Sequence, residues 1–461
     1  MTLQRGLAWV QKAFDVIPIW TIEPDISVVM ATAQPHLPCG TPYTVSPFAA
    51  GTFNKLFLPS PDGTDHNLPS FILRVALPVD PYLKTASEVA TLSYLSNHTS
   101  IPVPKVIAYD ASAENDLGFE WILMTRLPGV PLKELWSTAL LTWEERVRIT
   151  EQISGYIRQM QVVHFNRTGS LYFTGAQYPK LHTHARSNII KNESRFIALE
   201  FDPRYSIGPI VALPFFHTNR LKLALRRGPF SSSSAWLRSL LQLQIASTVD
   251  EMATMMAQSN NGDNACDADD LSELIDGITA ANNLLDLVDD FFDESDHETF
   301  QLTHDDLSAN NILIDPTTHQ VTGIVDWECV SFLPVWKAQS PPEFISGPEI
   351  NSGFYETNYG TPIPDVPPPP PPLDEIEEGS ELVLETREYL EKMLLRRVFD
   401  SCMTPDELSG KPKWKRIFAN QVAMIETMPH WVVKWAKGIN DGENPEPQAN
   451  GNEEMYFWPE R

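Results

Sequence analysis

The chain contains little cysteine. Its 461 residues include four cysteines, and no two of them have the C-x-x-C spacing of a metal or redox motif. A disulfide framework and a structural zinc site are therefore not expected. The four positions are Cys39, Cys266, Cys329 and Cys402.

Basic residues are also few. The chain has 34 Lys and Arg against 60 Asp and Glu, which gives a formal net charge of -26. Proteins that bind nucleic acids in general neutralise phosphates with clusters of Lys and Arg. The charge therefore argues against a nucleic-acid partner.

Long apolar runs are missing as well. No window approaches the roughly 18 uncharged apolar residues of a membrane span, and the N-terminus lacks the apolar core of a secretory signal. The sequence thus predicts a cytoplasmic protein, with the mitochondrion as the alternative compartment. Hydrophobic residues make up 42% of the chain, a proportion typical of folded globular proteins. Its length exceeds what one hydrophobic core usually holds, so more than one core is expected.

The first third of the chain predicts a helical extension and then a small lobe. Leu3, Leu7, Val10 and Phe14 have helical spacing, so residues 1–42 are predicted to form an N-terminal helical extension. Residues 43–126 combine short β-rich runs with one helical stretch, which is typical of a small α+β lobe. The β-rich runs lie at 53–58, 71–75 and 121–125, and the helical stretch at 84–96.

The remainder predicts a larger, mainly helical lobe over residues 127–340. Proline then dominates residues 341–380, and we expect a stiff extended crossing rather than a docking site for an SH3 or WW domain, because flanking basic residues are lacking. Residues 381–439 are predicted to be helices of the large lobe, and residues 440–461 a loose tail. The predicted helical stretches lie at 143–164, 271–292, 381–399 and 414–435.

One stretch carries chemistry, QLTHDDLSANNILIDPTTHQVTGIVDWE at residues 301–328. His304, Asp306 and Asn311 have the H-x-D-x-x-x-x-N spacing of a kinase catalytic loop. Two β-prone runs broken by Asp-Pro follow, and a hairpin would return Asp326 to the neighbourhood of Asn311. A carboxylate and a carboxamide could then hold Mg²⁺, which prefers oxygen ligands. Asp306 would orient a substrate hydroxyl and accept its proton, while His304 is predicted to hold the loop.

This loop resembles that of the aminoglycoside phosphotransferase and choline kinase-like families, which share the protein-kinase-like fold. Their usual form is H-G-D followed by N and later by apolar-D-W-E, and the sequence differs from it at Asp305, where Gly is common. Because only Asp306 has the correct spacing to Asn311, we expect Asp305 on the surface. The segments LPVDP, SEVATL, IPVPKV and GPF further resemble fungal proteins of this family.

The resemblance implies an α+β, bilobal fold with ATP and Mg²⁺ bound between the lobes. It implies a phosphate-covering loop around Gly51, a cation on the third strand at Arg74 paired with Glu88, and a hinge at Met124 and Arg126 whose backbone groups face adenine. Arg74 differs from the usual Lys. Arginine keeps the charge, but its planar head changes the reach of the side chain.

The predicted reaction is transfer of the γ-phosphoryl group of ATP to a hydroxyl of a small molecule. Asp306 is the predicted catalytic residue, and Asn311 and Asp326 are the predicted metal ligands. The alternative is a pseudokinase that acts as a binding or scaffold protein, which Arg74 and the single glycine of the phosphate loop favour. A protein kinase is disfavoured, because no D-F-G followed by A-P-E occurs after the loop.

Overall fold

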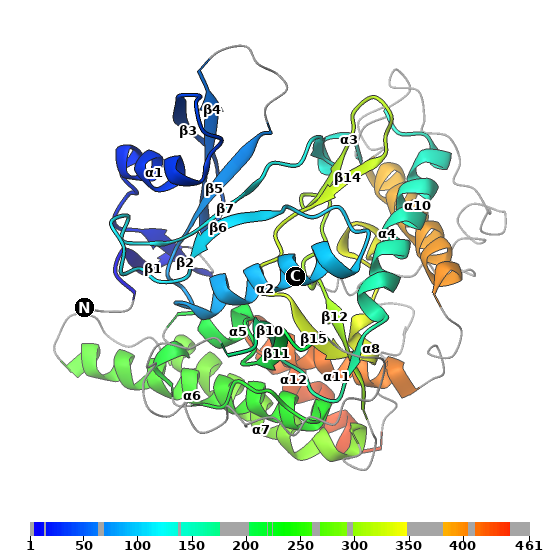
Figure 1. The fold of residues 1–461 in the computed structure, drawn as a ribbon. Coiled ribbons are helices and arrows are strands. Elements are labelled where there is room, and N and C mark those ends of the chain that lie inside the picture. Colours follow the sequence, from blue (N-terminus) through cyan, green and yellow to red (C-terminus); the bar gives the residue numbers. More distant parts are fainter. Residues whose placement is uncertain are drawn as a thin grey trace.

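The small lobe is built on a five-stranded antiparallel sheet with the strand order β3-β4-β5-β7-β6 (Figure 1). Every side chain of the central strand β5 is buried, because the sheet is covered on both faces. The strands are β3 (Tyr43–Ala50), β4 (Asn54–Pro61), β5 (Phe71–Ala76), β6 (Val106–Asp110) and β7 (Glu120–Thr125). The computed structural model describes residues 4–12, 15–62, 69–136, 140–175, 202–218, 220–223, 225–260, 268–292, 298–347, 381–403 and 411–442.

Two helices flank this sheet. Helix α1 (Ile26–Ala33) begins at the N-cap Asp25, and its Val29 and Ala33 belong to the same apolar cluster as Leu73 and Val75 of β5. Helix α2 (Leu83–His98), predicted at 84–96, lies between the sheet and the large lobe and contacts both. The small lobe is therefore joined to the rest of the chain by a packed helix as well as by the connecting segment.

The N-terminal segment differs from the prediction. β1 (Leu7–Lys12) and β2 (Asp15–Trp20) form an antiparallel hairpin, so the predicted helix over residues 3–14 is wrong, and α1 is followed by the short 3-10 turn η1 (Gln34–His36). Leu7 and Trp9, two positions apart, face the same apolar cluster, which a strand permits and a helix does not. Aromatic and β-branched residues concentrate in the hairpin and favour strand pairing. Leu3 and Phe14 lie outside the described residues.

The large lobe is mainly helical. Helices α6 and α7 pack against each other, and α7 also packs against α12. The predicted helices at 143–164, 271–292 and 381–399 are confirmed, whereas the stretch 414–435 is divided before Pro429, which begins a second helix. The long helices are α4 (Trp143–Gln161), α6 (Ser233–Asn260), α7 (Ala268–Phe291), α10 (Glu381–Cys402), α11 (Lys411–Met424) and α12 (Pro429–Asn440).

Short strands and turns complete the large lobe in three small sheets. β12 is central to the order β15-β12-β9, β13 is central to β14-β13-β8, and β10 pairs with β11. The strands are β8 (Val130–Pro131), β9 (His164–Phe165), β10 (Ser170–Phe173), β11 (Tyr205–Gly208), β12 (Phe300–Thr303), β13 (Ile312–Ile314), β14 (Val321–Ile324) and β15 (Ser331–Pro334). The short helices and 3-10 turns are α3 (Lys133–Trp136), α5 (Leu213–Phe216), η3 (Arg220–Lys222), α8 (Val335–Ala338) and η4 (Glu343–Ile345).

The two lobes share one of the apolar clusters of the described residues. Leu92 and Leu95 of α2 belong to the same buried cluster as Ile153 of α4 and Ile312 and Ile324 of the β13–β14 hairpin. A partly buried ion pair adds a second link, since Arg227 Nη1 lies 2.9 Å from Oδ1 of the buried Asp80, in the segment between β5 and α2.

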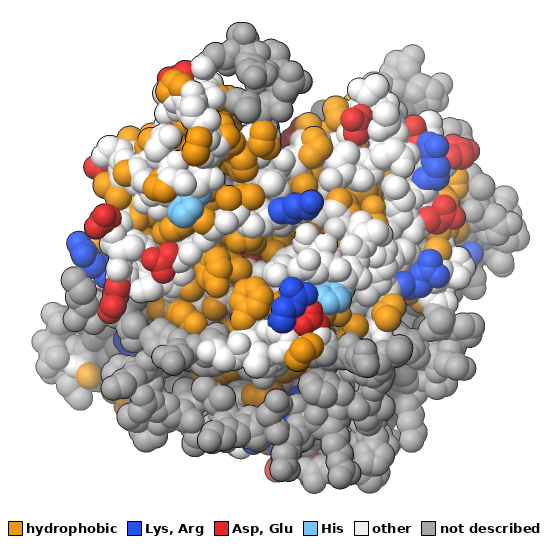
Figure 2. All heavy atoms as spheres, viewed as in Figure 1, with side chains coloured by type: hydrophobic (Ala, Val, Ile, Leu, Met, Phe, Trp, Pro, Cys, Tyr) orange, Lys and Arg blue, Asp and Glu red, His pale blue; other side chains and the backbone are white. Residues whose placement is uncertain are grey.

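The proline-rich crossing and the tail fall almost entirely outside the described residues, so their conformations and the predicted domain limits stay predictions. Among the described helices, none is both long and apolar enough to cross a membrane. On the face drawn in Figure 2, acidic and basic side chains of the described residues are interspersed, and apolar side chains gather over the small-lobe strands.

Candidate active site

The predicted catalytic loop lies between two short strands of the large lobe. β12 leads into residues 304–311, and β13 follows and pairs with β14 as an antiparallel hairpin. Ile312 pairs with Ile324, and the Val325 N–H donates to the Asn311 carbonyl over 2.9 Å. Because Asp326 comes directly after Val325, the hairpin returns it to the neighbourhood of Asn311, as the spacing of the motif predicts.

Asn311 and Asp306 are joined by their side chains. Asn311 Nδ2 donates to the Asp306 carbonyl at 2.9 Å and to Asp306 Oδ2 at 3.0 Å. Since the amide nitrogen is used in this way, Asn311 Oδ1 stays available as an oxygen ligand. The described residues contain no group of three or more His, Cys, Asp or Glu side chains that could hold a metal ion. An amide oxygen and one carboxylate fit Mg²⁺, which takes few protein ligands and completes its shell with water and phosphate oxygens.

Asp326 has an unusual backbone and an unusual acidity. Its φ of 62° lies in the left-handed region, which is uncommon for a residue other than glycine and is found often at functional sites. Asp326 is exposed to solvent, but the protein around its carboxylate disfavours the charged form. This desolvation, together with the charges of Glu328 and Glu88, raises the pKa of Asp326 to about 8.

The loop histidine is structural. His304 is buried, its Nε2 lies 3.0 Å from the Val325 carbonyl, and its ring meets Trp327 edge-on at 4.8 Å between centroids. Burial lowers the pKa of His304, which favours the neutral ring with a proton on Nε2. His304 thus fixes the start of the loop to the end of β14, in line with its predicted role.

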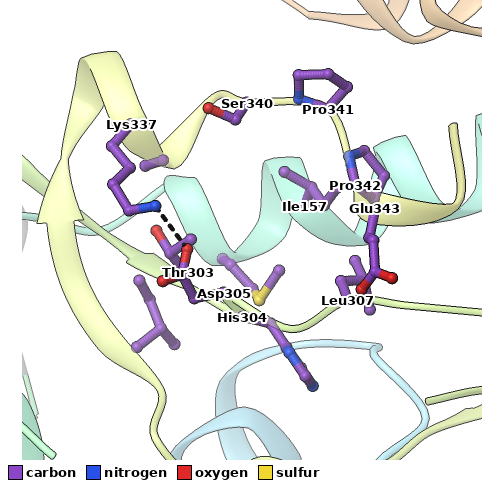
Figure 3. A pocket seen from close by; sticks show the side chains of 13 residues that line it. Ile157, Thr303, His304, Asp305, Leu307, Lys337, Ser340, Pro341, Pro342 and Glu343 are labelled. Atoms are coloured by element: carbon purple, nitrogen blue, oxygen red, sulfur yellow. Dashed lines mark ion pairs between the residues drawn. The ribbon is translucent and has the colours of Figure 1, made fainter. Parts of the chain in front are cut away.

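Asp305 is exposed, as predicted, and pairs with Lys337. Its Oδ1 lies 3.0 Å from Lys337 Nζ at the edge of a cavity beside the loop (Figure 3). The cavity measures about 70 Å³ and is bordered by Thr303, Pro341 and Glu343 among others. Pockets for drug-sized ligands measure roughly 300–1,000 Å³. This cavity is therefore too small for an aminoglycoside-sized acceptor.

Arg74 and Glu88 meet as predicted. Arg74 Nη1 donates to Glu88 Oε1 at 2.7 Å, Arg74 Nη2 bonds the second oxygen, and both side chains are less than 5% exposed. Burial opposes the charged form of Arg74, but the charges of Glu88, Glu328 and Asp326 raise its pKa overall. The planar guanidinium fork matches both carboxylate oxygens, a geometry that the usual lysine cannot provide.

Sequence reasoning missed two charged residues here. Lys84, in the first turn of α2, is 1% exposed and bonds Glu328, two residues beyond Asp326. Asn54 Nδ2 also donates to Glu328 Oε2 at 2.9 Å, and Lys84 Nζ donates to Asn54 Oδ1 at 3.1 Å. Burial opposes ionisation of Glu328, but Lys84 and Arg74 lower its pKa overall. In the sequence, only the last residue of the D-W-E motif, Glu328, pointed to this group of charged residues.

The predicted phosphate loop and hinge have the expected places in the fold. Gly51 lies in the turn between β3 and β4, where its N–H donates to the Asn54 carbonyl at 2.9 Å, and nothing lies within 4 Å of a Cβ built on it. Met124 lies in β7, paired with Ile72. The Arg126 N–H is already used by the Ser70 carbonyl at 2.8 Å, so this predicted hinge donor is not free.

The sequence model of the phosphotransferase enzyme family, APH, matches residues 44–196 and 226–336. The chain belongs to the phosphotransferase enzyme family. The matched residues include all the predicted site residues, and the resemblance inferred from the loop motif is confirmed. The α+β fold, with a sheet-rich N-terminal part and a helical part, is confirmed as well.

The chain is similar to several fungal proteins. A subtelomeric hrmA-associated cluster protein of Aspergillus fumigatus is 27% identical over 337 residues, which are 65% of this chain and 60% of that protein. Altered inheritance of mitochondria protein 9 of Clavispora lusitaniae is 28% identical over 191 residues, 39% of this chain and 29% of that protein. The chain thus spans less than two thirds of the length of these curated relatives. Among solved structures, an aminoglycoside phosphotransferase in complex with GDP and kanamycin superposes with a TM-score of 0.40 at 11% identity, covering 90% of this chain and 97% of the other.

Proposed function

We propose that this phosphotransferase moves the γ-phosphoryl group of ATP to a hydroxyl of a small molecule, with Mg²⁺ as the metal. The observation that supports this proposal best is the grouping of the Asp306 carboxylate, the Asn311 amide and the return of the β13–β14 hairpin at Asp326. Phosphoryl transfer needs little covalent chemistry from a protein, so positioning and charge neutralisation carry most of the catalysis.

Each side chain then has a separate task. Asp306 accepts the proton of the substrate hydroxyl. The hydroxyl oxygen forms a bond to the γ-phosphorus, while the bond between that phosphorus and the ADP oxygen breaks. Asn311 Oδ1 and the Asp326 carboxylate would hold Mg²⁺, which supplies neutralisation of the charge on the phosphate oxygens. The hydrogen bond from Asn311 Nδ2 to Asp306 Oδ2 fixes the position of the base relative to the metal ligand.

The acceptor binds against the large lobe in this proposal, but outside the small cavity beside Asp305. The acidic composition of residues 250–300, which contain no Lys or Arg, suits a cationic acceptor such as an amino alcohol or aminoglycoside, and a solvated helical face explains it equally. We propose the cytoplasm as the site of action, with the mitochondrion as the alternative. Imaging of the tagged full-length protein against a matrix marker distinguishes the two.

A binding module without turnover is the second candidate. It is favoured by one observation: Arg74 and Lys84 are already neutralised by Glu88 and Glu328. In that case the fold would present a surface to a partner, and loss of Asp306 would leave its cellular function unchanged.

A thermal shift with Mg-ATP, with Mg²⁺ alone and ATP alone as controls, tests the proposal first. Ligand at ~100 times its dissociation constant should stabilise the fold by about 2.7 kcal/mol. We expect a shift that requires both components and is lost in Asp326→Asn, followed by ADP release when a hydroxyl acceptor from a panel is added. No shift at millimolar nucleotide would overturn the proposal, and a shift without any ADP release would favour the binding module.

A further inference from the structure

The base of the small lobe contains two buried cations, although a kinase-type nucleotide site requires one. Arg74 and Lys84 lie within a group that also contains Asn54, Glu88 and Glu328, and we call these five residues the Glu328 network. The two cations differ in how firmly each is committed to a carboxylate.

Arg74 is fully engaged with Glu88. Both of its terminal nitrogens bond the two Glu88 oxygens, whereas its contact with Glu328 measures 3.5 Å, at the limit of a hydrogen bond. Its Nε is buried and has no partner among the described residues. Moving the guanidinium to a phosphate would leave the Glu88 charge buried and uncompensated.

Lys84 is placed differently. Its ammonium group bonds Glu328 and Asn54, which both belong to segments next to the candidate site. Asn54 begins β4 directly after the turn that contains Gly51, and Glu328 is two residues from Asp326. Lys84 Nζ therefore contacts both the segment that follows the predicted phosphate loop and the segment that carries the predicted metal ligand Asp326. An ammonium group carries three donors without a fixed plane, so it can exchange one anionic oxygen for another.

We propose that Lys84, rather than Arg74, is the cation that contacts the nucleotide phosphates. Arg74 is then a positioning residue that holds Glu88 and with it α2, and Glu328 occupies the place of the phosphate oxygens while no nucleotide is bound. On binding, phosphate oxygens replace the Glu328 carboxylate as acceptors for Lys84 Nζ and Asn54 Nδ2. This inference rests on the proposed function and explains how the family reaction can run with arginine on the third strand.

The test is calorimetric titration of the full chain with ATP, ADP, AMP and adenosine, each at the same Mg²⁺ concentration, so that metal contacts contribute equally in every variant. We expect Lys84→Met to weaken ATP binding by at least ~10-fold, because a charge-assisted hydrogen bond is lost. Adenosine affinity should change less than about twofold, a limit we set because Lys84 does not touch the base in this proposal. Lys84→Arg should restore most of the preference for ATP over adenosine. Arg74→Lys, the matched variant, should lower thermal stability but keep that preference.

Lys84→Met leaves Glu328 buried without its partner, so the double variant Lys84→Met/Glu328→Gln provides a neutral replacement that keeps the core intact. It too should lose the preference for ATP. Retention of the preference in either variant, or its collapse in Arg74→Lys alone, would overturn the assignment of Lys84. Failure of the unaltered protein to bind any nucleotide, with or without Mg²⁺, would instead overturn the proposed function and this inference with it.

Discussion

The catalytic loop and the Glu328 network lie at the same candidate site but are assembled in different ways. The loop and its hairpin occupy residues 304–328, and their geometry follows from spacing along one short segment. The network joins Asn54 to Glu328 across 274 positions and Lys84 to Glu328 across 244. The geometry of the catalytic loop therefore follows from local spacing, whereas the geometry of the Glu328 network depends on how the two lobes pack.

The sharpest way to test the loop is to change its two adjacent carboxylates separately. Asp306→Asn should lower kcat by about 10²- to 10⁴-fold, because a general base is removed, while thermal stability stays near that of the unaltered protein. Asp305→Asn is the matched control, since Asp305 is exposed and paired with Lys337 at the surface. We expect it to change kcat less than about twofold, given the small effect of exposed ion pairs. Equal losses in both variants would break the distinction between the two aspartates.

The Arg74–Glu88 pair of the network should affect stability rather than chemistry. Glu88→Gln removes one partner of a buried ion pair and should lower the free energy of unfolding by about 3–5 kcal/mol, measured by urea denaturation. Glu388→Gln removes an exposed partner of Lys392 in α10 and should change the same quantity by at most about 0.5 kcal/mol. A small effect of Glu88→Gln would mean that Arg74 is not committed to Glu88.

A buried glutamate makes the small lobe sensitive to pH. Glu120 is 3% exposed and accepts the Tyr82 N–H, and burial raises its pKa from 4.5 to about 7. Because the folded pKa is the higher one, its stabilising contribution is complete below pH 4.5 and is lost as pH rises through 7. The difference between the two pKa values corresponds to at most about 3 kcal/mol in the free energy of unfolding. Glu120→Gln should remove this decline between pH 5 and pH 8, and an unchanged decline would assign it to other groups.

In the large lobe, a glutamate makes stability depend on pH in the opposite direction, with a smaller expected effect. Glu145 forms the capping box of α4 with Thr142, and hydrogen bonds from His319 and the Thr142 backbone lower its pKa to about 2. Its contribution is present above pH 4.5 and is lost as pH falls toward 2. Glu145→Gln should lower the free energy of unfolding by about 1 kcal/mol at pH 7, as for other N-terminal helix caps. The loss should shrink as pH falls toward 2, where the folded-state carboxyl of Glu145 becomes about half protonated.

The comparison also shows how much the sequence could predict. The H-x-D-x-x-x-x-N spacing and the Asp-Pro turn predict the hairpin that returns Asp326 to Asn311, because both are local. Lys84 was overlooked, since a lysine in the first turn of an amphipathic helix normally faces solvent. Only the packing of α2 against the large lobe buries it.

Two elements of the fold show the same limit. The apolar residues of β1 fit helical spacing as well as alternation, and pairing with β2 decides for the strand. Helix α6 was missed because its apolar and polar residues do not segregate to faces, and it is stabilised by packing against α7. In both cases a contact between segments, and not local propensity, determines the structure.

The shared core has a consequence for how the molecule comes apart. A bilobal protein is often expected to melt in two steps, one for each lobe, but Leu92 and Leu95 of α2 belong to the cluster that holds the catalytic hairpin. Melting of the small lobe alone would strip apolar cover from Ile312 and Ile324, so the described lobes should lose their structure in a single cooperative transition. A substitution that leaves a cavity beneath α4 would then also destabilise the loop that carries Asp306.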